Sequence, residues 1–140
     1  MARTPFNAEV LTPEGQVFEG EVEMVSTRTT VGSLAVLAHH QPMLTLLEPT
    51  ELRLYEGEND IRRYAQGEGY MQVTGESVLL LVEEAIPPGD LDAADLRDRL
   101  RQAQESAQRA ESGSEEERLA QRDQRRWEAF LQIAESGARG

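Results

Sequence analysis

Apolar and polar residues alternate with a period of two through the first 86 residues of the chain. Phe6, Ala8 and Val10 set the pattern, and it returns at Val22 and Met24, at Leu52 and Leu54, and at Met71 and Val73. Successive side chains of a strand point to opposite faces, so this alternation predicts half-buried strands. Turn signals fall between them: Pro13-Glu14-Gly15, Gly32-Ser33, Glu48-Pro49, Gly57-Glu58-Asn59-Asp60 and Thr74-Gly75-Glu76. Many short strands at this spacing predict an antiparallel β-sandwich or flattened barrel.

Two stretches of this first part break the alternation. Leu34–Leu37 and Val78–Val82 are continuous apolar runs. We expect each of them to form a strand that is buried on both faces.

The pattern changes at Pro87-Pro88-Gly89, which neither continues a strand ladder nor begins a helix interior. We therefore predict a β-domain over residues 1–86, a hinge over 87–91 and a helical hairpin over 92–140. Asp92 is a favourable N-cap for a first helix over about 92–111. The fold class is α+β and mainly β.

A second helix is predicted over about 115–136. Ser114 and Glu117 form the pattern of a capping box, and Gly137 is the expected stop. Alanines dominate the apolar seam of the first helix, and the second helix is nearly all polar before Trp127. Because alanines bury little area, we expect the hairpin to be the less stable and movable part of the chain.

Composition narrows the possible chemistry. The chain has no cysteine, and all 14 of its basic residues are arginine, so disulfides, thiolates, Schiff bases and a phosphate-loop lysine are excluded. Only carboxylates remain as catalytic groups, and we expect no enzyme activity and no cofactor. The net charge of −12 disfavours nucleic acid and direct docking on anionic lipid. No apolar run is long enough to insert in a membrane, and the first residues lack a signal core, so a cytosolic-side location is expected.

Six motifs in order resemble one known family, the epsilon subunit of the bacterial F-type ATP synthase. The resemblance covers Phe6 to about Ser136. It rests on Val10 to Glu23, on Gly32 to Pro42, on Leu46 to Arg53, on Gly69 to Val73, on Val78 to Leu81 with Ala85, and on Asp90-Leu91-Asp92. Ala35, Ala38 and Thr50 depart from the family's usual glycine, proline and glycine.

This resemblance implies a function without catalysis. The β-domain would contact the gamma subunit and the c-ring, and the protein would help to couple proton translocation to rotary ATP synthesis. The hairpin would extend to the alpha and beta subunits and inhibit ATP hydrolysis. The implied location is the cytoplasmic side of the bacterial plasma membrane, as a peripheral central-stalk subunit.

The resemblance also suggests residues for each contact. The c-ring contact is expected in the loops that contain Thr30, Val31, Gly32, Ser33, His40 and Pro42. The hinge is expected at Pro87, Pro88 and Gly89. The regulatory contact of the hairpin is expected at Arg118, Arg122, Arg125, Arg126, Trp127 and Phe130. Some relatives bind ATP through a motif that Asp92 matches. Asp95 stands where that motif has an arginine, and a carboxylate repels phosphate, so we do not expect nucleotide binding here.

Other interpretations of these residues remain open. His39 and His40 are adjacent, and in extended chain their side chains point to opposite faces, which disfavours a metal site. The four arginines are either a partner surface or a solvated helix face partly neutralised by Glu115 and Asp123. Trp127 and Phe130 are either a binding hot spot or the contact that holds the hairpin on the β-domain. The alternative function is a free-standing adaptor whose hairpin recruits other proteins.

Overall fold

The computed structural model describes residues 3–139 of the chain, and the side chains of residues 3–136. The chain divides at the Pro87–Pro88 bond into two compact units. We call the first the β-domain and the second the hairpin. The prediction of an α+β, mainly β fold is confirmed.

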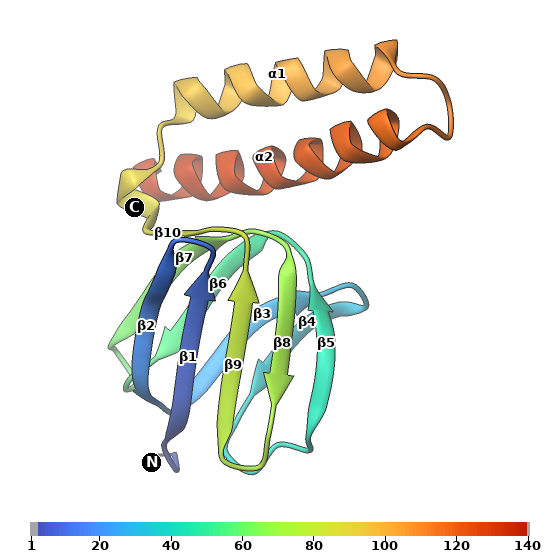
Figure 1. Cartoon of the computed structure of the whole chain (residues 1–140). Helices are drawn as coiled ribbons and strands as arrows, with labels where there is room; N and C mark the ends of the chain where they lie inside the picture. Colours follow the sequence, from blue (N-terminus) through green and yellow to red (C-terminus); the bar gives the residue numbers. More distant parts are fainter. Residues whose placement is uncertain (1–2, 140) are drawn as a thin grey trace. The chain divides into compact units, whose positions relative to one another are not determined.

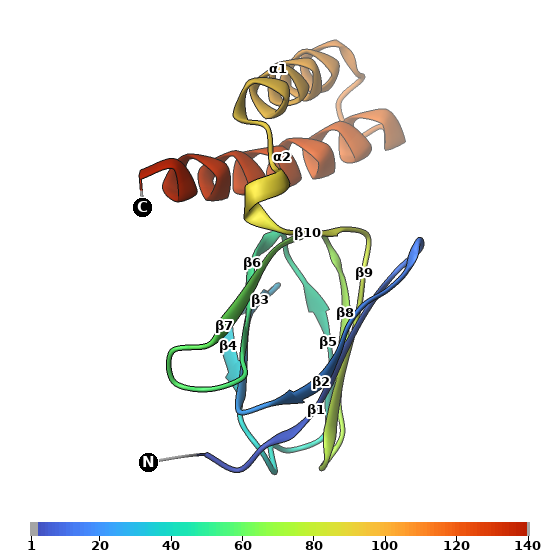
Figure 2. The same cartoon turned by 90° about the vertical axis from the view of Figure 1, so that its left-hand side faces the viewer.

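In the described part of the β-domain the chain forms ten strands (Figure 1). They are β1 (Phe6–Thr12), β2 (Gly15–Val22), β3 (Met24–Thr29), β4 (Gly32–Val36), β5 (Met43–Leu47), β6 (Thr50–Tyr55), β7 (Ile61–Gln66), β8 (Gly69–Val73), β9 (Ser77–Val82) and β10 (Ala85–Ile86). The order of neighbouring strands is β10-β7-β6-β3-β5-β8-β9-β1-β2, and β4 pairs with the free side of β3. Figure 2 shows the sheet folded into two facing layers. Strands β7, β6, β3 and β4 lie in one layer, and β5, β8, β9, β1 and β2 lie in the other.

One strand pair departs from the antiparallel expectation. β1 pairs with β9 in parallel, with Val10 opposite Leu80, whereas every other pair among the described strands is antiparallel. A turn joins an antiparallel pair directly, but β1 and β9 are at opposite ends of the β-domain sequence. Sequence alternation alone does not specify the direction of such a distant pairing.

The inner faces of both layers form the core. In β1, Phe6, Ala8 and Val10 are buried while Asn7 between them is exposed, as the alternation predicts. The buried core comprises Phe6, Ala8, Val10, Phe18, Val22, Val25, Val36, Leu47, Leu52, Leu54, Tyr64, Met71, Val73, Val78, Leu80 and Val82. These residues supply the apolar burial that stabilises the β-domain.

The two continuous apolar runs are not buried on both faces, so that prediction is wrong. Leu37 is 44% exposed and Leu81 is 45% exposed, while Val36 and Leu80 beside them are fully buried. In each run only one face lies in the core: exposed Leu37 directly follows the end of β4, and exposed Leu81 lies on the outer face of β9. A strand of period two in a two-layer sheet has only one inner face, whatever its composition.

A buried polar network lies among these strands. Gln66 at the end of β7 is fully buried, and its side-chain oxygen accepts a hydrogen bond from the Thr27 hydroxyl at 2.5 Å. Its side-chain nitrogen donates to the carbonyl oxygens of Glu48, at 2.9 Å, and Gly67, at 3.1 Å. One side chain thus links β3, the β5–β6 turn and the β7–β8 turn.

The hairpin consists of a 3₁₀ turn at Pro88–Asp90 followed by α1 (Ala93–Arg109) and α2 (Glu115–Arg139). Asp92 is the N-cap of α1, and its carboxylate accepts hydrogen bonds from the N–H groups of Ala94 and Asp95. The Ser114 hydroxyl caps α2 by accepting from the Glu117 N–H at 3.1 Å. Both predicted caps are confirmed.

The predicted end of the second helix is wrong. The helix runs through Gly137 to Arg139. A glycine in a helix costs about 1 kcal/mol relative to alanine, and the alanine and arginine that follow favour helix, so Gly137 alone does not end it. Between the two helices, Ala103 and Ala120 are buried, and the guanidinium of Arg97 lies 3.9 Å from the Glu135 carboxylate.

We predict that Gln66→Ala destabilises the β-domain by about 2–4 kcal/mol, because it removes the buried hydrogen bond from the Thr27 hydroxyl and the hydrogen bonds to the carbonyl oxygens of Glu48 and Gly67. Hydrogen exchange of the β-strand amides in the full chain measures this free energy locally. Gln72→Ala, at an exposed position of β8, is the matched control and should change it by less than about 0.5 kcal/mol. Equal effects of the two substitutions would contradict the role assigned to Gln66.

Candidate functional site

The outer side of one layer of the β-domain is unusually apolar. Leu44 and Leu46 of β5 are 71% and 49% exposed, and Tyr70 of β8 is 53% exposed. Leu81 of β9 is also exposed, and Leu11 of β1 and Leu79 of β9 are half-buried on the same side. We call these six residues the apolar face: Leu11, Leu44, Leu46, Tyr70, Leu79 and Leu81.

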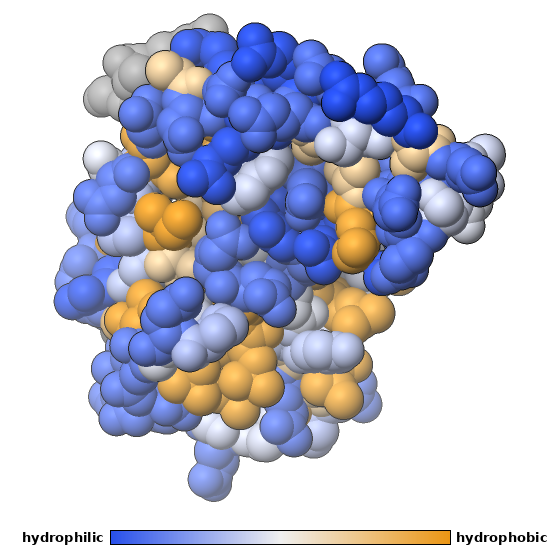
Figure 3. All heavy atoms as spheres, turned by 45° about the horizontal axis from the view of Figure 1, so that its top comes forward, coloured by the Kyte–Doolittle hydropathy of each residue, from blue (hydrophilic) through white to orange (hydrophobic). Residues whose placement is uncertain are grey.

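The strand register aligns four of them in a row. Leu46 pairs with Tyr70, Tyr70 with Leu81, and Leu81 with Leu11, across β5, β8, β9 and β1. Directly paired residues of neighbouring strands have their Cβ atoms about 4.5–5.5 Å apart, so the row is continuous. In Figure 3, apolar side chains gather among polar ones over the layer that faces the viewer in Figure 1. A continuous exposed apolar surface on a protein of this charge is typical of an interaction site.

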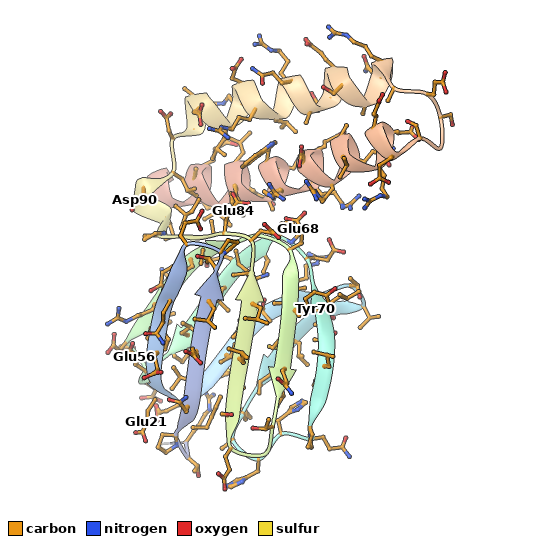
Figure 4. All side chains as sticks on the ribbon, viewed as in Figure 1. Glu21, Glu56, Glu68, Tyr70, Glu84 and Asp90 are labelled. Carbon is orange, nitrogen blue, oxygen red and sulfur yellow. The ribbon has the colours of Figure 1, made fainter. Side chains whose placement is uncertain are left out.

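A pocket of about 310 Å³ opens beside one end of this row. Its lining comprises Leu11, Thr12, Pro13, Glu68, Gly69, Tyr70, Leu81, Val82 and Glu83. Figure 4 shows Glu68 just before the start of β8 and Tyr70 farther along the same strand. The pocket therefore combines apolar walls with two carboxylates.

Gly69 permits the close approach of the strands below this pocket. A Cβ added at Gly69 would lie 2.0 Å from the Leu81 carbonyl oxygen and 2.8 Å from the Val82 Cα. Both contacts are with backbone, which has no freedom to move aside. Only glycine fits at this position.

The β3–β4 turn is the second exposed feature of the β-domain. Val31 at its tip is 94% exposed, and Gly32 has a φ of 133°, a conformation that favours glycine. The Thr29 hydroxyl holds the turn by donating to the Gly32 carbonyl and accepting from the Val31 N–H. The Thr30 N–H donates to the Leu46 carbonyl at 3.1 Å, so the turn begins beside the β5 edge of the apolar face.

The structure does not bring together all the residues predicted for the c-ring contact. Thr30, Val31, Gly32 and Ser33 form the β3–β4 turn and the start of β4, whereas His40 and Pro42 lie beyond the other end of β4. A five-residue strand separates the two groups by roughly 16 Å. His40 is half-buried, and its Nδ1 atom lies 2.8 Å from the Gln41 carbonyl oxygen. Two surfaces, not one, therefore correspond to this prediction.

In the hairpin, the four predicted arginines lie along α2. Arg118 pairs with Glu115, Arg122 lies 3.3 Å from Asp123, and Arg126 lies 3.9 Å from Asp123. Hydrogen bonding from Arg118 holds the pKa of the Glu115 carboxyl below its usual value. The expected partial neutralisation by Glu115 and Asp123 is confirmed. Arg118 and Arg125 remain exposed.

Trp127 is held between cations rather than lying free. The Arg99 guanidinium of α1 is 5.2 Å from the centre of its ring, and that of Arg126 is 5.3 Å away. Phe130, fully buried, meets Trp127 edge-on with 6.0 Å between the ring centres. Cation–π contacts of this geometry contribute about 0.5–1 kcal/mol at exposed sites. Trp127 thus joins α1 to α2.

The start of α1 carries two carboxylates with partners of their own. Asp92 accepts two backbone hydrogen bonds as the N-cap. Asp95 accepts a hydrogen bond from the Arg99 Nε at 2.8 Å. Both carboxylates therefore have structural partners within the helix.

Residues 3–139 contain no cluster of three or more His, Asp or Glu side chains placed to hold a metal ion. No helix in the same range is both long enough and apolar enough to cross a bilayer.

The apolar face was not predicted from the sequence. The run Val78–Val82 contains Leu79 and Leu81 of this face, but a continuous apolar run predicts burial on both faces instead. Gln72 and Glu9, which both pair with Leu79, are polar, so the individual strands do not show a continuous apolar surface in the sequence. The surface becomes apparent only when the pairing of the four strands is known.

Comparison with known proteins identifies the family. The sequence profile of the ATP synthase delta/epsilon chain β-sandwich domain matches residues 5–88. The chain belongs to this family. The resemblance noted in the sequence motifs is therefore confirmed.

Two bacterial relatives extend the similarity beyond the β-domain. The ATP synthase epsilon chain of Persephonella marina is 35% identical over 127 residues, covering 90% of this chain and 93% of the relative. That of Halalkalibacterium halodurans is 31% identical over 128 residues, covering 91% and 96%. The match therefore includes the hairpin.

Solved structures share the fold. A chain of the Euglena gracilis mitochondrial ATP synthase, from a structure of its OSCP, F1 and c-ring, has a TM-score of 0.74 at 20% identity, covering 100% of this chain and 84% of the other. A chain of the Tetrahymena thermophila mitochondrial ATP synthase central stalk and c-ring has a TM-score of 0.61 at 14% identity, covering 96% and 99%.

We predict that Arg99→Met weakens the hairpin by about 0.5–1 kcal/mol, because it removes one of the two cations over the Trp127 ring together with the ion pair to Asp95. Trp127 is the only tryptophan, so urea unfolding followed by its fluorescence reports on the hairpin alone. Asp95→Asn removes the ion pair but keeps the cation, and its effect should be smaller, about 0.3–0.5 kcal/mol. The cation–π role is wrong if Asp95→Asn destabilises as much as Arg99→Met.

Proposed function

We propose that this protein is the non-catalytic central-stalk, or rotor, subunit of a bacterial F-type ATP synthase. The main support for this proposal is the similarity to epsilon chains over both the β-domain and the hairpin. In this role the subunit couples proton translocation to rotary ATP synthesis and inhibits ATP hydrolysis through its hairpin. It lies peripherally on the cytoplasmic side of the plasma membrane and needs no cofactor. Catalysis belongs to the alpha and beta subunits, consistent with a chain that lacks cysteine and lysine.

The apolar face is the proposed contact with the gamma subunit. Leu44, Leu46 and Tyr70 are each about half exposed or more, and covering them removes apolar surface from water. Tyr70 lies inside the row, between Leu46 and Leu81. Tyrosine is one of the residue types enriched at interface hot spots, which cluster near the centre of an interface.

The β3–β4 turn is the proposed contact with the c-ring. Val31 is almost fully exposed at its tip, and Thr30 is anchored to Leu46 at the edge of the apolar face. One backbone hydrogen bond therefore connects the β3–β4 turn to β5, the edge strand of the apolar face. His40 and Pro42, at the other end of β4, belong to a separate surface of the β-domain.

The hairpin is the proposed regulatory element, with Pro87, Pro88 and Gly89 as its hinge. Arg118 and Arg125 are exposed on α2 and are suited to acidic segments of the alpha and beta subunits. Arg122, Arg126 and Trp127 complete the proposed contact, and Phe130, which is fully buried here, would join it only after the hairpin rearranges. We propose that ATP does not regulate this hairpin, because Asp95 pairs with Arg99 where the ATP-binding relatives have an arginine.

We predict that Tyr70→Glu weakens binding to the gamma subunit of the same organism by about thirtyfold or more, because it places a charge in the centre of the apolar face. Calorimetric titration of purified gamma with the full chain measures the change. Ala35→Glu introduces the same charge at an exposed position of β4, in the other layer, and should leave the affinity within about threefold. An unchanged affinity for Tyr70→Glu refutes the assignment of this face.

We predict that ending the chain at Gly89 raises ATP hydrolysis by the assembled complex, because the hairpin is then absent. The rate per complex is compared with that of the full-length subunit, after gel quantification shows equal incorporation of both. Normal incorporation with unchanged hydrolysis would eliminate the inhibitory role and leave the assembly role intact.

A further inference from the structure

The β-domain has a second outer face, on the layer that contains β3, β4, β6 and β7 (Figure 2). Outward residues alternate with buried ones in β3 and β6, and the outward residues of this layer include Arg28, Arg53 and Arg63, which are all exposed. We call these three residues the arginine face. Glu51 is the one carboxylate among the outward residues of the described strands of this layer. Three arginines and one glutamate give the face a charge of +2, whereas the whole chain carries −12.

Strand pairing places the three arginines on one continuous surface. Arg53 is directly opposite Arg63 of β7 on one side and Ser26 of β3 on the other. Arg28 is two residues beyond Ser26 along β3, about 7 Å away on the same face, and it is opposite Ser33 of β4. The residues between the arginines are small, and the side chains of Arg53 and Arg63 are 46% and 51% exposed. The guanidinium groups are therefore accessible to a partner.

The chain neutralises only part of this positive charge. The Glu51 carboxylate accepts a hydrogen bond from the Arg53 Nε at 2.7 Å and lies 3.9 Å from the Arg63 Nε. One carboxylate therefore serves two guanidinium groups, each of which has five N–H donors. Arg28 forms no ion pair with the side chains of residues 3–136. Because like charges directly opposite on neighbouring strands destabilise a sheet, a further carboxylate beside Arg53 and Arg63 would be favourable.

The surroundings of the arginine face limit the size of the anion that it accepts. Residues 1–86 hold 14 acidic residues and five arginines, so the charge of this part of the chain is −9. Interactions between exposed charges extend over about 8–10 Å at ordinary ionic strength. A nucleic acid or an anionic membrane extends beyond this range and meets the surrounding acids. A short protein segment with two or three carboxylates lies within the face, and arginine pairs strongly with carboxylates.

We propose that the arginine face binds an acidic segment of a partner protein, in which two or three Asp or Glu side chains contact Arg28, Arg53 and Arg63. The arginine face and the apolar face lie on opposite layers of the β-domain. The β-domain therefore has room for this partner and for the gamma subunit at the same time. The contact is additional to the proposed function and does not depend on it.

The test is a titration of the full chain with a fluorescein-labelled peptide in which glycine and glutamate alternate. Such a peptide places its carboxylates about 7 Å apart when it is extended. Arg28→Gln and Arg63→Gln should each weaken binding by about threefold to tenfold at low salt and reduce its salt dependence, because each substitution removes an exposed charge pair. Fluorescence anisotropy measures the affinity over a range of salt concentrations.

Arg62→Gln is the matched control. Arg62 adjoins Arg63 in the sequence, but its guanidinium lies over the Phe18 ring of β2, 5.5 Å from the ring centre. This substitution removes the same charge away from the arginine face, and the affinity for the peptide should stay within about twofold. The proposal is overturned if the unmodified chain does not bind the peptide. It is also overturned if Arg28→Gln and Arg63→Gln bind the peptide as well as Arg62→Gln does.

Two further measurements identify the class of partner. A thymidine oligonucleotide and phosphatidylglycerol vesicles replace the peptide in the same titration, and tighter arginine-dependent binding of either one overturns the assignment to a protein segment. Titration with purified gamma separates the two faces. Arg28→Gln should leave the affinity for gamma within about twofold, and a larger loss overturns the second contact. If Tyr70→Glu leaves gamma binding unchanged while the arginine variants lose the peptide, the proposed gamma contact fails and the arginine face is supported.

Discussion

The close contact between Gly69 and the Leu81 carbonyl is the constraint on which the outer surface of the β-domain depends. It fixes the register of β8 and β9, with Gly69 opposite Val82 and Tyr70 opposite Leu81. A shift of one residue would turn every outward side chain of these strands into the core and every core side chain outward. Because β5 pairs with β8 and β1 pairs with β9, the same register aligns Leu46 and Leu11 with the central pair. The apolar row and the pocket both follow from this one alignment.

The sequence predicts most of the fold because alternation and capping are local signals. The spacing of Phe6, Ala8 and Val10 is enough to predict that their side chains face the core. The helix starts at Asp92 and Ser114 are predictable because each side chain accepts a hydrogen bond from a backbone N–H two or three residues later. The parallel pairing of β1 with β9 is not local, since its partners are about seventy residues apart in the chain. The prediction that Gly137 ends the second helix is wrong for a different reason. One glycine is a weak helix-stop signal, and the helix propensity of the residues around it outweighs that signal.

The candidate interaction surfaces also differ in how far local sequence signals predict them. Exposed Val31 and the arginines of α2 are found from sequence because a turn tip and a charged helix face are recognisable individually. The apolar face requires side chains from four strands, and Leu79 and Leu81 are indistinguishable by composition from Val78, Leu80 and Val82, which are buried. An apolar side chain is expected to be removed from water. Whether the protein core or a binding partner covers it depends on the face of the sheet to which strand pairing assigns it.

The two units present different chemistry, and this difference has a consequence for the proposed role. A partner that covers the apolar face excludes water from side chains of several strands. Binding at this face therefore depends weakly on salt concentration, and the subunit stays bound while the complex turns. The surface of α2 presents arginines, and contacts between exposed charges are screened over about 8–10 Å at ordinary ionic strength. The contacts of the hairpin are therefore individually weak and readily exchanged. A subunit built in this way stays attached through its β-domain while its hairpin changes partners, which a single uniform interface would not permit.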